Sequence, residues 1–409
     1  MSQTEFIAGL DIGTTKACCV VAEADLEEES VDIIGVGLVP SSGLRRGVVV
    51  DLEATTSAVR GAVDKAQRMA GTVSIRSVVV SVTGEHISSL NSRGVIAITG
   101  RDREVAPSDV DRVIEASKVI VLPPDREIIH AIPRGFSLDG QDGVKDPVGM
   151  SGSRLEVETH IVTGSSAFLD NVVKCVQRAG LAVDTTVLEP IATSEAVLIP
   201  AEKDLGVALI DIGGGTTDIA VFTVGEIFYT GVLPVGGNHV TNDIAVGLRA
   251  SHEESEKTKV GYGCAVANQV AEDDTFEITT LGAEEPTELP REILARIIEP
   301  RAQEILQMAR AEIMKSGYLE MLPAGAVLTG GGSLLPGALG QAEKILGMPV
   351  RLGTPRNIGG LNDTVESPIY ATAVGLVLYA AKNQATHREQ EKSAALKQGL
   401  KDIFKRFFG

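Results

Sequence analysis

The stretch Asp11-Ile12-Gly13-Thr14-Thr15-Lys16 recurs later in the chain as Asp211-Ile212-Gly213-Gly214-Gly215-Thr216-Thr217-Asp218. Each copy lies between two short β-rich runs, which are Phe6 to Leu10 and Ala17 to Ala22 for the first, and Gly206 to Ile210 and Ile219 to Thr223 for the second. Apolar runs of this length are typical of buried strands, so each copy predicts a strand, a glycine turn and a second strand. The repeat therefore predicts an internal duplication.

Glycine turns of this kind are suited to anions. Glycine exposes successive backbone N–H groups as a concave nest that binds phosphate, and threonine hydroxyls add donors. An Asp at the strand end can hold a hydrated Mg²⁺ between itself and a phosphate. One such hairpin alone is equally consistent with an ordinary tight turn. Two copies favour a site that grips one nucleotide from both sides, with Asp11 and Asp211 on the side of the metal.

A third glycine-rich segment, Gly330-Gly331-Gly332-Ser333, follows the β-branched run Ala326 to Thr329 and precedes a helix-like segment from Leu334 to Leu346. Three glycines between strand and helix let a flat nucleoside lie against bare backbone beside a helix N-terminus. A glycine triplet is weak evidence alone, but the order of the three segments is informative. Neither GxxxxGK[ST] nor GxGxxG occurs as a competing motif.

This order resembles the actin, DnaK-type chaperone and sugar-kinase superfamily, in which two related halves close on ATP and Mg²⁺. The resemblance implies that Leu188 to Ala196 is the linking helix, and that Glu189 approaches the metal or the attacking water as the candidate catalytic residue. It also implies that the charged stretch Glu253 to Lys257 edges the adenine. The expected nucleotide-binding residues are Gly13, Thr14, Thr15, Lys16, Gly213, Gly214, Gly215, Thr216, Thr217, Gly236, Gly237, Glu253, Lys257, Gly331, Gly332 and Ser333.

The composition fits a globular protein of more than one domain. The chain has 409 residues, 44% of them hydrophobic and 22% charged, and no apolar run reaches the ~18 residues needed to span a bilayer. The N-terminus lacks the layout of a signal peptide, and four cysteines without metal spacing indicate reduced core residues of a cytosolic protein. The net charge of −18 disfavours general nucleic-acid binding, which needs a basic surface.

The pattern along the chain predicts a mixed α/β, two-lobed duplicated fold with a small α/β insert in the first lobe. The expected parts are a first-lobe core (1–83 and 164–195), its insert (84–163), a second-lobe core (196–229 and 300–381), its insert (230–299), a polar linker (382–395) and a terminal amphipathic helix (396–409).

Several elements are expected with particular boundaries. Asp51 caps a helix through Met69, and Ser108 with Asp111 opens a helix in the first insert. The segment Leu138 to Ser153 is expected to be a loop. The segment Pro290 to Ser316 has helical spacing that Pro300 kinks or divides, and Tyr370 to Ala381 is the final core helix.

The tail is basic and amphipathic, in contrast to the acidic chain. Its apolar residues fall on one helical face: Leu396, Leu400, Ile403, Phe404, Phe407 and Phe408. Lys397, Lys401, Lys405 and Arg406 against Asp402 give it a local charge of +3 (four minus one). Such a helix is typical of a membrane interface. The alternative is a terminal helix that docks on its own domain, which the polar linker before it disfavours.

The first-lobe insert and the tail together resemble the FtsA family of bacterial cell-division proteins. The resemblance covers nearly the whole chain and includes His130 to Pro133, Asp146 to Met150 and Glu156 to Gly164 within the insert. It implies that the insert contacts the next protomer of a filament and that the tail is a membrane-targeting helix. ATP binding follows from the motifs, whereas ATP turnover is expected to be weak if present.

The family resemblance implies a peripheral membrane adaptor at the division site, on the cytoplasmic face of the bacterial membrane. Such an adaptor tethers filaments of the tubulin-like protein FtsZ and recruits later division proteins. The FtsZ C-terminal peptide is expected around Asn238 to Arg249 and Pro290 to Arg301, with Arg291, Arg296 and Arg301 as candidate contacts.

Three alternatives share parts of the pattern. A sugar or acetate kinase would have the same ATP motifs but would leave the tail unexplained. A pilus-assembly relative would share the core and the insert but would be anchored differently. A DnaK-type chaperone would need a large β-rich domain after residue 381, where only 28 residues remain (409 minus 381).

Overall fold

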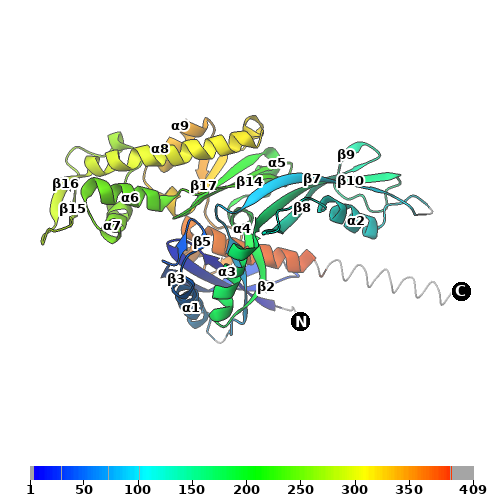
Figure 1. Ribbon diagram of the computed structural model, residues 1–409, viewed down its shortest axis with the longest axis horizontal. Helices are drawn as coiled ribbons and strands as arrows, with labels where there is room; N and C mark the ends of the chain where they lie inside the picture. Colours follow the sequence, from blue (N-terminus) through cyan, green and yellow to red (C-terminus); the bar gives the residue numbers. More distant parts are fainter. Residues whose placement is uncertain (1–3, 29, 72, 101, 387, 389–409) are drawn as a thin grey trace.

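Two sheets with the same strand order form the two lobes of the molecule (Figure 1). The computed structural model describes residues 4–28, 30–71, 73–100, 102–386 and 388. The first sheet consists of β1 (Thr4–Ile12), β2 (Lys16–Asp25), β3 (Ser30–Pro40), β6 (Ser77–Val82), β11 (Ala182–Leu188) and β19 (Gly359–Gly360). The second consists of β12 (Val207–Ile212), β13 (Thr217–Thr223), β14 (Glu226–Leu233), β17 (Ala326–Thr329) and β18 (Val350–Leu352).

The pairing confirms the duplication. In the first sheet β1 pairs antiparallel with β2 and β2 with β3, while β1–β6 and β6–β11 are parallel. In the second sheet β12–β13 and β13–β14 are antiparallel, while β12–β17 and β17–β18 are parallel. Each hairpin motif therefore occupies the same place in its own sheet.

Helices cover the outer face of each sheet. On the first sheet these are α1 (Leu52–Met69) and α3 (Ser166–Arg178), and on the second they include α6 (Gly237–Leu248), α8 (Arg291–Lys315) and α9 (Ala338–Leu346). Asp51 caps α1 as expected, with its carboxylate accepting the N–H groups of Glu53 and Ala54. Further helices are α5 (Pro200–Leu205), α7 (His252–Tyr262) and α10 (Asn362–Val365).

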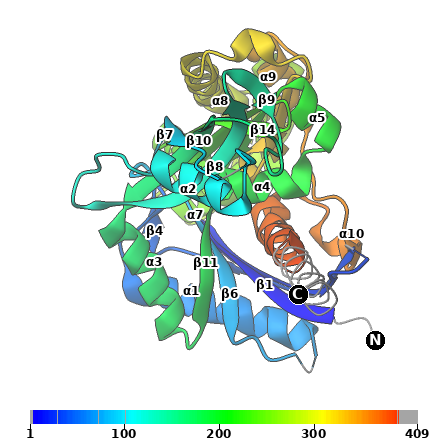
Figure 2. The ribbon, with the colours of Figure 1, turned by 90° about the vertical axis from the view of Figure 1, so that its right-hand side faces the viewer.

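Two helices lie between the sheets and join the lobes. They are α4 (Glu189–Val197) and a final helix over residues 371–386, whose buried side chains share one core with strands of both sheets. Figure 2 shows this final helix on the face of the first sheet opposite α1 and α3. Gly375 permits its close approach to α4, because a Cβ there would lie 2.0 Å from the Ala192 carbonyl oxygen.

The insert is a separate four-stranded sheet beside the lobes, with the order β7-β10-β8-β9. Its elements are β7 (Ser88–Ala97), α2 (Pro107–Ser117), β8 (Arg126–Leu138), β9 (Gln141–Val144) and β10 (Arg154–Ser165). α2 covers one face, where Val113, Leu155 and Val157 form a small core. The remaining strands form two short pairs, β4 (Leu44–Arg45) with β5 (Val48–Val49) and β15 (Thr275–Ile278) with β16 (Thr287–Pro290).

Several local expectations were wrong. α2 does not begin with a box of Ser108 and Asp111, because the Asp109 carboxylate accepts the N–H of Ala106 at 3.0 Å instead. The expected loop from Leu138 to Ser153 contains β9. Pro300 does not divide α8, which runs continuously from Arg291 to Lys315. Proline has no N–H, so the helix loses one hydrogen bond to the carbonyl group four residues earlier. Because Pro300 is exposed, that carbonyl group faces water.

Two more boundaries differ. The helix expected to begin at Leu334 starts only at Ala338, after a 3₁₀ turn, η3 (Gly331–Leu334). The final helix continues beyond Ala381 through residue 386, so the expected linker does not begin at 382. Lys382 forms an ion pair with Glu195 at 3.1 Å, and Arg388 pairs with Glu5. Among the described residues, no helix has the length and apolarity needed to cross a membrane.

Candidate functional site

The two glycine hairpins face each other across the gap between the lobes. Pairing in the first ends at Ile12 with Ala17, and the Gly13 N–H donates to the Lys16 carbonyl oxygen at 2.8 Å. The second repeats this geometry, with Gly213 N–H donating to the Thr216 carbonyl oxygen at 2.9 Å. The duplication therefore extends to the hydrogen bond that closes each turn.

The hairpins approach so closely that two glycines are required. A Cβ on Gly214 would lie 2.6 Å from Thr15 Cγ2, and one on Gly215 would lie 2.4 Å from Thr14 Oγ1. These glycines thus permit contact between the lobes in addition to exposing backbone N–H groups.

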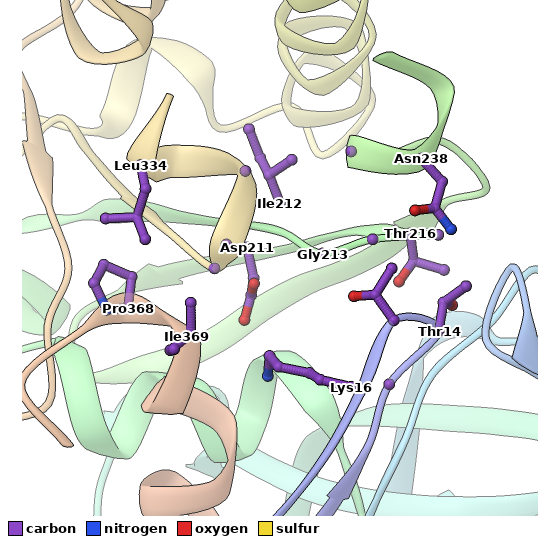
Figure 3. A pocket seen from close by; sticks show the side chains of 18 of the residues that line it. Thr14, Lys16, Asp211, Ile212, Gly213, Thr216, Asn238, Leu334, Pro368 and Ile369 are labelled. Atoms are coloured by element: carbon purple, nitrogen blue, oxygen red, sulfur yellow. The ribbon is translucent and has the colours of Figure 1, made fainter. Parts of the chain in front are cut away.

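A cavity of about 440 Å³ lies between the hairpins and the second-lobe helices. It is lined by Asp11 to Lys16, Gly47, Thr83, Glu189, Asp211 to Thr216, Gly237, Asn238, Val240, Glu256, Lys259, Val260, Ala302, Ile305, Leu306, Gly330 to Gly332, Leu334 to Pro336, Ala338, Pro368, Ile369 and Thr372. Figure 3 shows Leu334, Pro368 and Ile369 together at one side and Thr14, Thr216 and Asn238 at the other, with Asp211 between them. The cavity therefore has an apolar end and a polar, glycine-rich end.

Most of the sequence-predicted site residues line this cavity. They are Asp11, Gly13, Thr14, Thr15, Lys16, Glu189, Asp211, Gly213, Gly214, Gly215, Thr216, Gly237, Gly331 and Gly332. Segments from three distant parts of the sequence are thus brought together in one place.

Three predicted residues lie behind the lining. The Thr217 hydroxyl donates to the Val235 carbonyl oxygen at 2.8 Å, and the buried Ser333 hydroxyl donates to the Gly330 carbonyl oxygen at 2.6 Å. Gly236 is needed for packing, since a Cβ there would lie 2.5 Å from the Gly213 carbonyl oxygen. These residues shape the loops that carry the lining residues.

The residues of α7 that line the cavity differ from those predicted. Glu253 and Lys257 form an exposed pair at 2.9 Å on the helix surface and do not line the cavity. Glu256 and Lys259 do, and their side chains pair at 2.7 Å. Lys259 also donates to the Thr241 hydroxyl at 2.9 Å and to the Gly237 carbonyl oxygen at 3.2 Å, which anchors it beside the second hairpin.

Four carboxylates gather where the lobes meet. Asp11 pairs with Lys16 at 3.1 Å and accepts from the Ser81 hydroxyl at 2.9 Å. The other three accept hydrogen bonds from threonine hydroxyls: Asp211 from Thr193 at 3.1 Å, Asp218 from Thr83 at 2.5 Å, and Glu189 from Thr372 at 3.4 Å. Of the cations that the structure describes, Lys16 is the one that acts on this group, so negative charge is in excess.

The protonation equilibria reflect this excess. Burial, with the neighbouring charges of Asp218, Asp11 and Asp211, raises the pKa of Glu189 well above its usual value. Burial also raises the pKa of Asp211 to about 6, although Lys16 opposes the shift, and the pKa of Asp218 to about 7. Burial opposes the charge on Lys16, but the attraction of Asp11 outweighs it and the pKa of Lys16 is raised.

The donor set fits a hydrated cation better than a directly ligated one. Among the described residues, no three His, Cys, Asp or Glu side chains form a metal-ion site. Within the same part of the chain, the buried Asp218 Oδ2 and Asn238 Oδ1 atoms lack a hydrogen-bond partner. Excess negative charge with unpartnered buried oxygens is what a water-coordinated divalent cation beside a phosphate would compensate.

The apolar end of the cavity was missed by sequence reasoning. Val240, Val260, Ile305 and Leu306 come from three helices of the second lobe, and Pro368 with Ile369 precede the final helix. Apolar residues at helical spacing indicate an ordinary core, so no local signal distinguishes them. The glycine triplet, two residues of which lie in η3, was the available clue to this end of the cavity.

The three arginines proposed for peptide binding differ in their surroundings. Arg291 donates to the Tyr262 carbonyl oxygen at 2.7 Å and pairs with Asp274, and Arg301 pairs with Asp243 at 2.7 Å. Both therefore hold parts of the second lobe together. Arg296 is exposed and pairs with Glu292 one turn away on the same helix.

The proposed membrane residues lie outside the described part of the chain. They are Leu400, Lys401, Ile403, Phe404, Lys405, Arg406, Phe407 and Phe408.

Two family models match the chain. "Cell division protein FtsA" matches residues 208–375, and "SHS2 domain inserted in FTSA" matches residues 84–163. Among solved structures, the "PilM-PilN type IV pilus biogenesis complex" has a TM-score of 0.67 at 16% identity, covering 92% of this chain and 98% of that one. MreB5 of Spiroplasma citri has a TM-score of 0.54 at 15% identity, covering 94% and 98%. At these identities the likeness shows the fold, which is actin-like.

Relatives in sequence are much closer. The cell division protein FtsA of Pseudomonas aeruginosa is 45% identical over 381 residues, covering 93% of this chain and 90% of the relative. FtsA of Bacillus subtilis is 41% identical (94% and 85% covered), and that of Escherichia coli K12 is 39% identical (93% and 91%). Identity of this extent over nearly the whole chain, together with the inserted domain, decides between the pilus-assembly and cell-division alternatives: the chain belongs to the FtsA family of cell division proteins.

Proposed function

We propose that this chain is an ATP-binding adaptor that polymerises and tethers FtsZ filaments to the cytoplasmic face of the bacterial membrane at the division site, where later division proteins join it. Membership of the FtsA family supports the division role. The facing glycine hairpins support the nucleotide, and the basic amphipathic tail supports the membrane.

The observation that carries nucleotide binding is the pair of hairpins closed by matching hydrogen bonds, at the polar end of a cavity whose other end is apolar. A nucleotide has the same polarity, with phosphates at one end and a flat base at the other. The threonine hydroxyls at Thr14, Thr15 and Thr216 would donate to the phosphates. MreB5 of Spiroplasma citri, which shares the fold, was solved bound to ADP and to AMPPNP.

Asp11 and Asp211 would hold Mg²⁺ through water, since both lie at strand ends beside the hairpins. The ion, when bound, neutralises phosphate charge and polarises the terminal phosphoryl group. Lys16 keeps one carboxylate paired, and the Thr193 hydroxyl orients the other. Glu189, which lines the same cavity, would orient or deprotonate a water molecule near the terminal phosphate.

The test of the nucleotide site is Gly213→Val, measured by calorimetric titration with ATP and Mg²⁺. A Cβ at Gly213 lies 3.2 Å from the Thr216 carbonyl oxygen, so the branched side chain crowds the turn. We expect binding to weaken about tenfold or more, the loss of one charge-assisted hydrogen bond or more. Gly340→Val is the control because its Cβ meets open space on α9. Equal affinity of wild type and Gly213→Val contradicts the assignment.

The outer surface of α6 and α8 is the proposed binding surface for the FtsZ C-terminal peptide. Val246 is 80% exposed and Ile293 41% exposed, while Gly247 brings α6 against Ile297, 2.9 Å from where its Cβ would be. Exposed apolar side chains on adjacent helices are typical of peptide-binding surfaces. Val246→Glu should abolish binding of the peptide in fluorescence anisotropy. Val224→Glu, at a position 64% exposed on another part of the second lobe, should leave it unchanged.

The insert is proposed to form the head-to-tail contact of the filament. After α2, the segment 118–124 presents Val119 and Val121 to solvent, and Val119 is 85% exposed. A Val121→Glu substitution should remove the filaments seen by electron microscopy on lipid monolayers while leaving nucleotide affinity unchanged. Filaments of normal length in this variant contradict the role of this segment.

A further inference from the structure

The insert is joined to the first lobe through the chain and through side chains at its base, where His130 Nε2 accepts the Leu188 N–H of β11 at 2.9 Å, and to the second lobe through side chains alone. Its two ends leave the first lobe at Thr83-Gly84 and return at Ser165, where α3 begins. This neck contains Gly84, at φ +134°, and Gly164. His86 ties the two neck chains, since its Nδ1 accepts the Ser165 N–H at 3.2 Å. Gly164 lies within β10 and is paired with Glu127 of β8, whereas Gly84 lies outside the strands, so Gly84 is the position of the neck that is suited to act as a pivot.

The other attachment is to β14, the edge strand of the second-lobe sheet. Ser89 Oγ on β7 donates to the Thr230 carbonyl oxygen at 2.7 Å. His160 on β10 lies between Asn91 Oδ1, 2.8 Å from its Nδ1, and Thr230 Oγ1, 3.0 Å from its Nε2. His160 is 1% exposed, so loss of these hydrogen bonds would leave its ring nitrogens buried without partners.

An aromatic contact adds to the hydrogen bonds. The Arg134 guanidinium on β8 lies over the Phe228 ring of β14, 3.5 Å from its centroid. Phe228 packs edge-on against Tyr318, beyond the end of α8, with centroids 4.9 Å apart. The Arg134 side chain is 5% exposed. Desolvated cation–π contacts of this kind are among the stronger ones.

The neck of the insert also contacts the cleft directly. Thr83, the last residue before Gly84, lines the cavity and donates to Asp218 of the second hairpin at 2.5 Å. Movement of one hairpin relative to the other therefore displaces the residue at which the insert begins.

From these contacts we propose that the insert is latched to β14 and travels with the second lobe, pivoting at its base near Gly84, so that closure of the cleft reorients the insert relative to the first lobe. The inference rests on the proposed nucleotide function for the closing signal, but the latch itself does not. The proposed assembly surface on the insert would then change its direction when nucleotide enters the cleft, which links filament formation to nucleotide state.

The test uses spin labels and pulsed paramagnetic resonance on the full chain. Cysteines replace exposed residues on the insert (Asp142→Cys), the first lobe (Asp64→Cys) and the second lobe (Lys344→Cys), in pairs. The four native cysteines are buried and will not be labelled. Without nucleotide, the distance between insert and second lobe should be narrowly distributed. Arg134→Ala combined with Thr230→Val should broaden it, whereas Arg154→Ala should not, since Arg154 pairs with Glu156 inside the insert.

With ATP and Mg²⁺, the distance from insert to first lobe should shift together with the distance between lobes, while the distance from insert to second lobe stays constant. A constant distance from insert to first lobe overturns the proposal, as does a distribution that is equally broad in wild type and in the double variant. The nucleotide-free comparison keeps the latch testable if calorimetry shows that ATP does not bind, so failure of the latch and failure of the nucleotide site are distinguishable.

Discussion

The buried side chains of the cleft carry more negative than positive charge, which a bound cation would compensate. Glu189, Asp211 and Asp218 all have raised pKa values, with burial as the main cause. A structural network would pair such groups internally, since unpaired buried charge destabilises a fold. Retaining them at the junction of two lobes is typical of a site whose ligand supplies the missing charge.

Glu189→Gln tests the role of this carboxyl group. The substitution keeps the shape and the contact to Thr372 but removes the base. We expect nucleotide affinity within about threefold of wild type, and any phosphate release to fall by about 100-fold, the usual contribution of a positioned general base. The measurement is a coupled phosphate assay beside calorimetry. A variant that hydrolyses ATP at the wild-type rate would exclude Glu189 from the chemistry.

A histidine at the base of the insert gives a pH dependence. His130 Nε2 accepts the Leu188 N–H at 2.9 Å, and burial lowers the pKa of His130 to about 4. A folded-state pKa below the unfolded value of about 6.5 means that the neutral ring stabilises the fold above pH 6.5. This contribution, about 3 kcal/mol at most, is lost as the pH falls from 6.5 towards 4.

Urea unfolding of wild type and His130→Gln at pH 7, 5.5 and 4.5 measures this directly. The difference in free energy of unfolding should shift in favour of the variant as the pH falls, since glutamine cannot be protonated. Other titrating groups are common to both proteins and cancel in the difference. A difference that does not vary with pH would contradict the assignment.

At the scale of elements, α7 shows how a correct segment can be assigned the wrong face. The residues that line the cavity, Glu256 and Lys259, are three positions apart, and the exposed pair Glu253 and Lys257 is four apart on a neighbouring face. α7 has few apolar residues to mark its buried side, so only its packing against α6 decides which charges turn inward.

The pair Lys259→Ala and Lys257→Ala turns this difference into an experiment. Removal of Lys259 should weaken ATP affinity by roughly 10- to 100-fold, as expected for a charge-assisted hydrogen bond of about 1.5–3 kcal/mol. Lys257→Ala should bind as wild type does, because that side chain is exposed and distant from the lining. Calorimetric titration measures the ATP affinity of both variants. Equal losses of affinity would support the residues of α7 that were expected from sequence.

The features that could be predicted from sequence are those that depend on neighbouring residues alone. The hairpins and β17 were predicted because short apolar runs bounded by glycine have few other interpretations, and Asp51 is a cap that acts within its own turn. β9 was missed because its Gly143 and neighbouring turn residues suggest a loop, and its pairing with β8 is a tertiary property. The continuity of α8 through Pro300 likewise depends on which side faces water, which spacing alone does not give.

At the scale of the molecule, one helix connects the cleft with the C-terminal segment. Ile369 and Thr372 line the cavity, and the helix that follows is buried between the lobes up to Ala381. Its end is tied to α4 by Lys382 with Glu195 and to β1 of the first lobe by Arg388 with Glu5. The final described helix therefore ends at a fixed point, and many copies in a filament would present their C-terminal residues to one surface.

We expect this geometry to make the proposed membrane attachment a property of the polymer. One short amphipathic helix binds lipid weakly and reversibly, because the gain from its apolar face is offset by the ordering of a flexible segment. When one tail of a filament is bound, the next binds intramolecularly, and avidity rises by orders of magnitude.

Liposome co-sedimentation should therefore depend steeply on protein concentration and on ATP. It should vanish with Phe404→Glu and weaken on neutral lipid, where the four basic residues lose about 1 kcal/mol each. The Val121→Glu protein, which should not assemble, retains the tail and isolates its intrinsic affinity. If that protein bound liposomes as tightly as wild type, the tail alone would suffice and the dependence on assembly would be wrong.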